Sequence, residues 1–258
     1  VKLRPPFIKN ATNLIGKEIP MAVLQSETKI LKRPRVDSPR FTIILSSFNR
    51  TSYLKDAIDS VIRQTFKNWE LIICDDNSFA DTQKVITGYM NGQHKNKIGV
   101  IGTDVQDADR LSSVRYSVLI NEALRMARGD IICYLTDDTM YFKTKLEVLD
   151  KAYSKQPIET AYNIQRRAFV NEKGNETTPA TKEFRQQFGI LACPATVVDH
   201  SSFSHTRSIG MGLLWETDPE FWPCADGVFQ CLVAERTDIV PIPHCLDEHK
   251  YHSHNAAW

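Results

Sequence analysis

Residues 41–78 read FTIILSSFNRTSYLKDAIDSVIRQTFKNWELIICDDNS, and they predict a strand, a helix and a second strand, in that order. The run 41–45 is short and mostly apolar, with Thr42 as its one polar residue, and it is rich in β-branched residues, which is typical of a strand buried on both faces. Residues 51–62 repeat apolar side chains at three- and four-residue steps, as one face of an amphipathic helix does. Residues 69–74, which are apolar except for Glu70, predict a second buried strand that leads directly into two aspartates. The stretch therefore predicts a βαβ unit with polar side chains at the carboxyl ends of two parallel strands, where open sheets bind ligands.

The alternation of strands and helices continues after this unit. The sequence predicts a helix over 81–90, a strand over 98–102, a helix over 113–128 with Gly129 as its C-cap, and a strand over 130–135. This order predicts an α/β fold, with a central and mostly parallel sheet flanked by helices. Further along, the patterns predict a helix over 141–153, strands over 161–171 and 195–203, and an apolar segment over 228–234.

The predicted organisation is an N-terminal extension followed by one domain. Residues 1–40 mix prolines with basic residues and show no long period, so we expect an extended arm with at most one short element around 21–31. Residues 41–258 are expected to form one domain, whose half 41–138 binds a nucleotide and whose half 139–258 binds the donor sugar and the acceptor.

Length and charge exclude some classes of function. The 258 residues carry 32 Lys and Arg against 31 Asp and Glu, so no overall charge marks a nucleic-acid or membrane binder. The apolar runs are of strand length and the N-terminus has no hydrophobic signal segment, so we expect no transmembrane segment and a cytoplasmic location. The six cysteines lack C-x-x-C spacing, so we expect free thiols instead of a zinc site.

A long ordered pattern carries a resemblance to a known family. The order S-S-F-N-R, helix, Q-T-F and W-E-L-I-I-C-D-D-N-S resembles the opening of family 2 glycosyltransferases, which have the Rossmann-like GT-A fold. The resemblance spans roughly residues 40–255 and is closest to the spore-coat polysaccharide branch of that family. It implies transfer of a sugar from a UDP- or dTDP-sugar to a hydroxyl acceptor, such as a saccharide, with inversion and with Mn²⁺ or Mg²⁺ as cofactor.

Two adjacent carboxylates follow the strand predicted over 130–135. Asp137 and Asp138 are like charges at one strand end, which is unfavourable unless a cation or hydrogen bonds compensate them. Hard oxygen ligands favour Mg²⁺ or Mn²⁺, whereas the alternative is an exposed acidic turn that caps a helix. The resemblance implies that Asp137 contacts ribose and Asp138 binds the metal. It also implies His252 as a further metal ligand or phosphate contact, with His254 as the alternative, unless these histidines belong to a polar tail.

The nucleotide contacts are also predicted at strand ends. A base pocket needs an aromatic face and polar groups for the imide edge, and the resemblance implies a preference for uracil or thymine. A guanidinium holds phosphate oxygens without titrating, although a lone arginine is more often a solvated surface charge. Arg115 is a weaker candidate for the phosphate contact than the two arginines named next. The five positions implied are Ser46, Phe48 and Asp76 for the base, and Arg50 and Arg110 for the diphosphate.

The remaining candidates lie in the C-terminal half. Asp226 stands before a predicted helix in a segment that resembles the catalytic-base segment of the family, although an isolated Asp there could be only an N-cap. The resemblance also implies Asp199 and His200 beneath the donor sugar. Trp215 and Glu216 belong to a cluster of aromatic rings and carboxylates that is common in sugar sites and also at the rims of ordinary cores.

Two other functions are compatible with such a sheet. A nucleotidyltransferase would need a glycine-rich, basic phosphate loop near the first strand, and the S-S-F-N-R segment has no glycine. A catalytically silent sugar-nucleotide-binding protein would have no use for Asp226 or an acceptor region.

Overall fold

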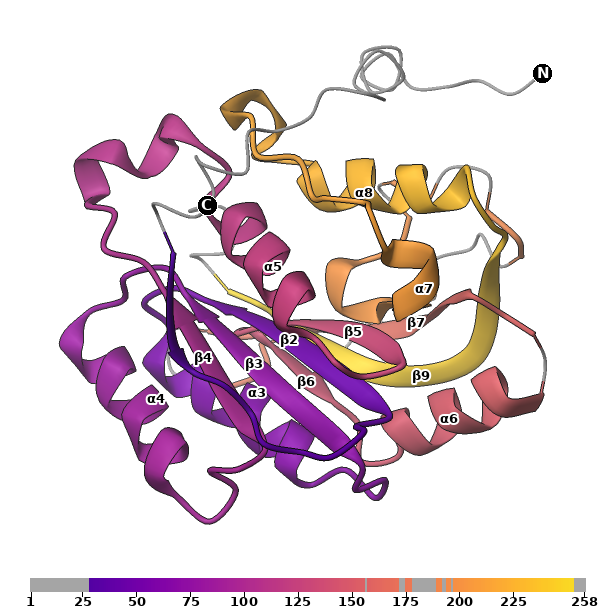
Figure 1. The fold of residues 1–258 in the computed structure, drawn as a ribbon, viewed down its shortest axis with the longest axis horizontal. Helices are drawn as coiled ribbons and strands as arrows, with labels where there is room; N and C mark the ends of the chain where they lie inside the picture. Colours follow the sequence, from indigo (N-terminus) through magenta and orange to yellow (C-terminus); the bar gives the residue numbers. More distant parts are fainter. Residues whose placement is uncertain are drawn as a thin grey trace.

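The computed structural model describes residues 28–155, 157–171, 175–177, 189–191, 194–195 and 197–252, and these ranges form a nine-stranded sheet with helices on both faces (Figure 1). The strands are β1 (Lys29–Lys32), β2 (Phe41–Ser47), β3 (Trp69–Asp75), β4 (Ile98–Gly102), β5 (Ile131–Thr136), β6 (Thr139–Tyr141), β7 (Thr160–Phe169), β8 (Phe203–Thr206) and β9 (Ile239–Tyr251). The helices are α3 (Thr51–Ile62), α4 (Ala80–Asn91), α5 (Arg115–Met126), α6 (Lys145–Lys155), α7 (Arg207–Gly210) and α8 (Ala225–Ala234). Three 3-10 turns are η1 (Asp107–Ser112), η2 (His200–Ser202) and η3 (Pro219–Phe221).

The centre of the sheet is parallel, as the sequence predicts. The strand order is β1-β4-β3-β2-β5-β8-β7-β9-β6, and β4, β3, β2 and β5 all run in one direction. Ser46 pairs with Cys74 of β3 and with Thr136 of β5, so the three strands end at the same edge. This register brings the predicted polar side chains after β2, β3 and β5 to one place.

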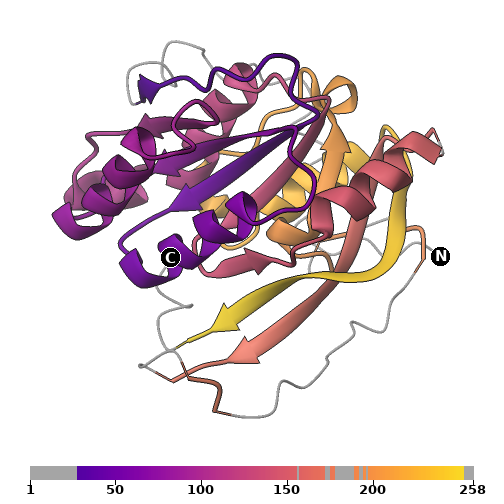
Figure 2. The same cartoon turned by 90° about the horizontal axis from the view of Figure 1, so that it is seen from below.

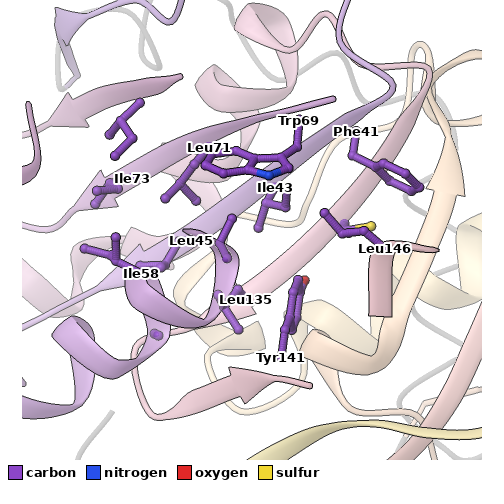
Figure 3. Packing of buried hydrophobic residues seen from close by; sticks show 14 of the residues in the cluster. Phe41, Ile43, Leu45, Ile58, Trp69, Leu71, Ile73, Leu135, Tyr141 and Leu146 are labelled. Atoms are coloured by element: carbon purple, nitrogen blue, oxygen red, sulfur yellow. The ribbon is translucent and has the colours of Figure 1, made fainter. Parts of the chain in front are cut away.

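Helices cover both faces because the parallel strands are apolar on both. Helices α3, α4 and α6 pack against one face, and α5 and α8 against the other (Figure 1). Figure 3 shows the first of these layers, in which Ile43, Leu71 and Leu146 are fully buried. Burying one such side chain stabilises the fold by about 1.5–3 kcal/mol. The site therefore stands on a rigid base.

Gly129 has a different role from the one predicted. Helix α5 ends at Met126 and Ala127 is its C-cap, so the prediction that Gly129 caps it is wrong. Gly129 instead donates its N–H to Thr42 Oγ1 over 2.9 Å, and a Cβ at this position would lie less than 3 Å from the backbone of Phe41 and Thr42. The glycine is required for the close approach of the chain to β2.

The predicted strand over 195–203 is wrong in its position. Residues 197–202 form turns, and β8 begins only at Phe203. Asp199 accepts a hydrogen bond from the Ser201 N–H over 2.9 Å, so the polar D-H-S-S segment caps its own turn instead of extending. The predicted helix over 141–153 likewise begins later, at Lys145, because residues 139–141 pair with β9 as β6.

Sequence patterns did not predict strand β9, the longest strand of the described residues. It runs beside β7 as a long ribbon, which Figure 2 shows from below. Their register shifts around Ile164, and only the second half of β9 also pairs with β6. No described strand covers the outer edge of the first half, which carries Pro241 and Pro243.

The N-terminal part of the chain contributes one strand. Strand β1, from within the predicted extension, pairs antiparallel with β4. The predicted domain boundaries stay a prediction, and residues 1–27 of the extension lie outside the described residues. Within the described ranges, every helix is too short or too polar to cross a bilayer.

Candidate active site

A pocket of about 500 Å³ opens at the carboxyl edge of the parallel strands. It brings together five of the predicted site residues, which come from β2, the turn after β5, the segment before η2, η2 itself and α8. The residues that line it are Ser46, Tyr116, Thr136, Asp138, Asp199, His200, Trp222, Pro223, Asp226, His249 and Tyr251.

The acidic pair is buried and compensated by one arginine. Arg50 Nη1 lies 2.9 Å from Asp137 Oδ1 and 2.9 Å from Asp138 Oδ2. Asp137 also accepts from the Phe48 N–H over 3.0 Å, and Asp138 from Thr136 Oγ1 over 2.7 Å. Burial raises the pKa of Asp137 to about 7, although Arg50 opposes this shift. The alternative of an exposed acidic turn is therefore excluded, and Arg50 contacts the carboxylates that follow β5.

Two histidines face Asp138. His252 Nε2 lies 3.6 Å from Asp138 Oδ2, and the His252 ring stacks on Tyr53 with centroids 4.8 Å apart. His249, which was not predicted, has Nδ1 3.4 Å from Asp138 Oδ1 and 2.9 Å from Thr139 Oγ1. Burial would raise the pKa of Asp138, but His252, His249 and Arg50 together hold it below its usual range.

The donor set at Asp138 fits a divalent cation. Neighbouring ligand atoms of a six-coordinate Mg²⁺ or Mn²⁺ lie about 3 Å apart, and the two imidazole nitrogens lie 3.4 and 3.6 Å from the two carboxylate oxygens, so each is slightly farther away than a neighbouring ligand would be. In the described part of the chain no three such side chains already surround a common point. Binding a cation at Asp138 would also require Arg50 to give up its contact with this carboxylate. His254 lies outside the described residues.

Asp76 is buried in two ion pairs instead of standing open. Arg110 Nη2 lies 3.1 Å from Asp76 Oδ2, and Arg115 Nε lies 3.3 Å from Oδ1. Burial raises the pKa of Asp76, although the two guanidinium groups lower it. The Arg110 guanidinium carbon lies 3.1 Å from the centre of the Phe48 ring, so arginine covers the predicted stacking face. A nucleobase at this site would have to share Asp76 and Phe48 with Arg110.

Asp226 lies in the first turn of α8, and it is not the N-cap. Cys224 is the N-cap residue, and Asp226 Oδ1 accepts from the Gly227 N–H over 2.7 Å. Burial raises the pKa of Asp226 to about 6, with a smaller contribution from Asp199 and an opposing one from the Gly227 N–H. The side chain is half-buried and lines the pocket. It is therefore a carboxylate that is mostly ionised near neutral pH and accessible from the cavity.

The first residue of η2, His200, is a neutral histidine that lines the same pocket. Burial lowers the pKa of His200 to about 4, so its imidazole is uncharged at neutral pH. Its Nε2 has no hydrogen-bond partner among the described residues, although the ring lines the pocket. Asp199, which is next to it in the chain, caps η2 and lines the same pocket.

The aromatic wall of the pocket differs from the prediction. Trp215 is 1% exposed and stacks on Phe229 in the core, and it is not among the lining residues. Glu216 accepts the N–H groups of Thr217 and Asp218, and does not line the pocket either. Trp222 and Tyr116 line it instead, with their rings 5.7 Å apart. The roles of Trp215 and Glu216 at a sugar stay predictions.

One signal could have identified a missed residue. His249 and Tyr251 both line the pocket and lie two residues apart on β9. A period of two is the strand signature that places such residues on one face, but it is visible only once β9 is recognised as a strand.

Comparison with known proteins identifies related chains. A family model described as "Glycosyl transferase family 2" matches residues 42–206. Protein CgeD of Bacillus subtilis (strain 168) is 38% identical over 215 residues, covering 81% of this chain and 49% of that protein. The UDP-Glc:alpha-D-GlcNAc-diphosphoundecaprenol beta-1,3-glucosyltransferase WfgD of Escherichia coli is 28% identical over 127 residues, covering 49% of this chain and 46% of that protein. The chain thus spans about half the length of these curated relatives.

Solved structures show the same fold. S. aureus TarS 1–349 in complex with UDP matches with a TM-score of 0.61 and 13% identity, covering 82% of this chain and 60% of that one. The mannosyltransferase PcManGT from Pyrobaculum calidifontis, in complex with GDP-Man and Mn²⁺, matches with a TM-score of 0.60 and 12% identity, covering 95% of this chain and 63% of that one. At such identities the likeness shows the fold alone, and it confirms the predicted GT-A fold.

Proposed function

This chain belongs to glycosyl transferase family 2, and we propose that it transfers a sugar from a UDP- or dTDP-sugar to a hydroxyl acceptor with inversion. The observation that carries the proposal is one pocket lined by both Asp226 and Asp138, a candidate base and a candidate metal ligand. Since the chain spans about half of its curated relatives, the proposal concerns the activity of this domain.

Asp226 is the proposed general base. Its pKa of about 6 leaves the carboxylate mostly ionised at pH 7 while keeping it basic enough to accept a proton. It takes the proton of the acceptor hydroxyl as the acceptor oxygen attacks the anomeric carbon of the donor sugar. The bond from that carbon to the nucleoside diphosphate breaks on the opposite side, and a single displacement of this kind inverts the configuration.

The leaving diphosphate needs positive charge. Mn²⁺ or Mg²⁺ would be held by Asp138 with His249 and His252, and when bound it supplies charge stabilisation to the departing phosphate oxygens. Arg50, which lies within hydrogen-bond distance of both carboxylates, adds a permanent cation beside this position. Asp137, held by the Phe48 N–H, is the proposed ribose contact.

The proposed nucleobase site is formed by Ser46, Phe48 and Asp76, and Arg110, the predicted diphosphate contact, lies against Asp76 and the Phe48 ring. A carboxylate that already holds Arg110 and Arg115 presents a polar, hydrogen-bonding wall, which suits the imide edge of uracil or thymine. The TarS complexes with UDP and with UDP-GlcNAc favour uracil, whereas the PcManGT complex contains GDP-Man. We therefore propose a UDP-sugar donor before a dTDP-sugar.

The proposal is tested by incubating the protein with Mn²⁺ and a panel of nucleotide sugars. A transferase without its acceptor should slowly hydrolyse one donor to the nucleoside diphosphate, and Asp226→Asn should strongly lower this rate. Pyrophosphate exchange would indicate a nucleotidyltransferase instead, and binding without any turnover would indicate a silent sugar-nucleotide-binding protein.

A further inference from the structure

A fully buried ion pair between α6 and β9 joins four elements of the fold. Lys145, at the start of α6, donates from Nζ to Asp247 Oδ2 over 2.6 Å and to the Ser201 carbonyl over 2.7 Å. Asp247, on β9, also accepts from Ser202 Oγ over 2.9 Å and from Asn163 Nδ2 over 2.8 Å. The two charged side chains are 1% and 0% exposed. One carboxylate thus connects α6, β7, β9 and η2.

Stability alone is a poor explanation for this pair. Removing a lysine and an aspartate from water costs several kcal/mol per ion, and a well-packed apolar pair often gives equal or greater stability. The Lys145 ammonium also lies 4.0 Å from the centre of the Tyr141 ring, which belongs to the apolar core. The ion pair therefore matters more for the arrangement of the four elements than for their stability.

The first geometric consequence concerns the register of β9. The β7–β9 ladder is regular up to Asn163 opposite Ile242, then shifts, and becomes regular again from Gln165 opposite Asp247. Backbone pairing before the shift therefore does not fix the strand after it. A slip of one residue would turn every later side chain to the other face of the sheet. Asp247 stands where the pairing resumes, and it also lies opposite Tyr141 of β6.

The second consequence concerns the two histidines that the register of β9 brings to Asp138. His249 follows Asp247 by two residues on the same strand and lies 3.4 Å from Asp138. His252 follows the strand directly and lies 3.6 Å from the same carboxylate. The η2 turn, which Lys145 holds through the Ser201 carbonyl, directly follows Asp199 in the chain.

We propose that Lys145 and Asp247 are positioning residues that fix the register of residues 247–251 and the place of η2. They thereby bring His249 and His252 to Asp138, and they hold Asp199 and His200 where these two residues line the pocket. This inference rests on the metal site and transferase function proposed above. Residues that orient metal ligands typically change metal affinity by about 10–100-fold when they are removed.

The test compares Asp247→Asn with a matched control, Glu70→Gln. Glu70 is a buried carboxylate at the other end of the strands, and it accepts from Thr42 Oγ1 over 2.7 Å and from the Arg128 N–H over 2.8 Å. UDP is titrated by calorimetry in Mn²⁺ and in chelator. Asp247→Asn should lower the Mn²⁺-dependent gain in UDP affinity by about 10-fold or more and leave the affinity in chelator unchanged. Glu70→Gln should preserve both affinities even though it also lowers stability.

Hydrogen exchange gives a second readout that needs no metal. The amides of residues 199–202 and 247–251 should exchange faster in Asp247→Asn, and they should keep wild-type protection in Glu70→Gln. If Asp247→Asn does not fold, the double variant Lys145→Met/Asp247→Asn replaces it, because that variant leaves no unpaired buried charge. The proposal is overturned if either folded variant keeps wild-type exchange in both segments, or keeps the full Mn²⁺-dependent affinity. A wild-type protein without any Mn²⁺ effect would contradict the proposed metal site, and hydrogen exchange would then decide the positioning role by itself.

Discussion

Replacing Asp226 by Asn should make the protein less active and more stable at the same time. In the folded protein burial raises the pKa of Asp226 from 3.8 to about 6, so between these values the folded state binds more protons than the unfolded state. Stability must therefore fall as the pH rises through this window. A difference of about two pH units at 1.36 kcal/mol each gives about 3 kcal/mol, and the half-buried side chain reduces our expectation to about 2 kcal/mol.

Asn retains the oxygen that accepts the Gly227 N–H but carries no charge. Asp226→Asn should therefore match the wild type in stability near pH 4 and exceed it by about 2 kcal/mol at pH 8. For a chain of this size that corresponds to a melting temperature higher by about 4–8 °C. Sugar transfer should fall by about 10²–10⁴-fold, the usual contribution of a general base, whereas the affinity for UDP should not change.

The assay is thermal unfolding from pH 4 to pH 8, combined with rates of transfer or donor hydrolysis. Asp218→Asn is the matched control, because Asp218 is an exposed aspartate that caps η3 through the Glu220 N–H, a bond that Asn can also make. This control should change neither property by much. If Asp226→Asn and the wild type were equally stable at every pH, the raised pKa of Asp226 in the folded protein would be refuted. Transfer near the wild-type rate would show that Asp226 is not the base, and Asp199 would be the next candidate.

Three further outcomes follow from the site and the fold. Asp138→Asn should weaken UDP binding in Mn²⁺ but change it little in chelator, whereas equal losses in calorimetry under both conditions would contradict the metal role. If Asp76 reads the imide edge, UDP and dTDP should bind more tightly than GDP by about 1–3 kcal/mol in the same titrations, and a preference for GDP would exclude this assignment. Gly129→Ala should destabilise the fold by about 3 kcal/mol or more, because its methyl group would overlap the backbone of Phe41 and Thr42. Denaturant unfolding measures this loss. An unchanged midpoint would show that the backbone at residue 129 can move away from β2 without loss of stability.

Local periodicity predicted the N-terminal half of the fold, where each strand is a short buried run and each helix repeats apolar residues at three- and four-residue steps. The run 41–45 is apolar except for Thr42 and is buried on both faces, so its pattern identifies a strand of a parallel sheet. Because parallel strands end at one edge, the positions of Ser46, Asp76 and the pair after β5 followed from the order of the elements. The candidate site in this half could therefore be located from the sequence.

The remaining features of the fold and the site depend on contacts between distant segments, which the spacing of residues in the sequence does not reveal. Strand β9 has prolines and a register shift where an alternating pattern would be expected, so His249 was missed. No local signal distinguishes Trp222, which lines the pocket, from Trp215, which is buried in the core, because packing between distant elements decides which ring meets the cavity. The arginines that hold Asp76 likewise come from η1 and α5, and their ion pairs form only when these elements fold against β3.

The two prolines on the outer edge of β9 have a consequence for the behaviour of the protein at high concentration. An uncovered strand edge offers unpaired N–H and C=O groups to a second molecule and is a common start of aggregation. Proline has no N–H to offer, and it is tolerated in a strand where that side faces away from the neighbouring strand. Pro241 and Pro243 thus make this edge a poor template for intermolecular pairing. Exchanging both for valine would remove that protection without touching the pocket, so such a protein should remain catalytically competent when dilute and precipitate when concentrated.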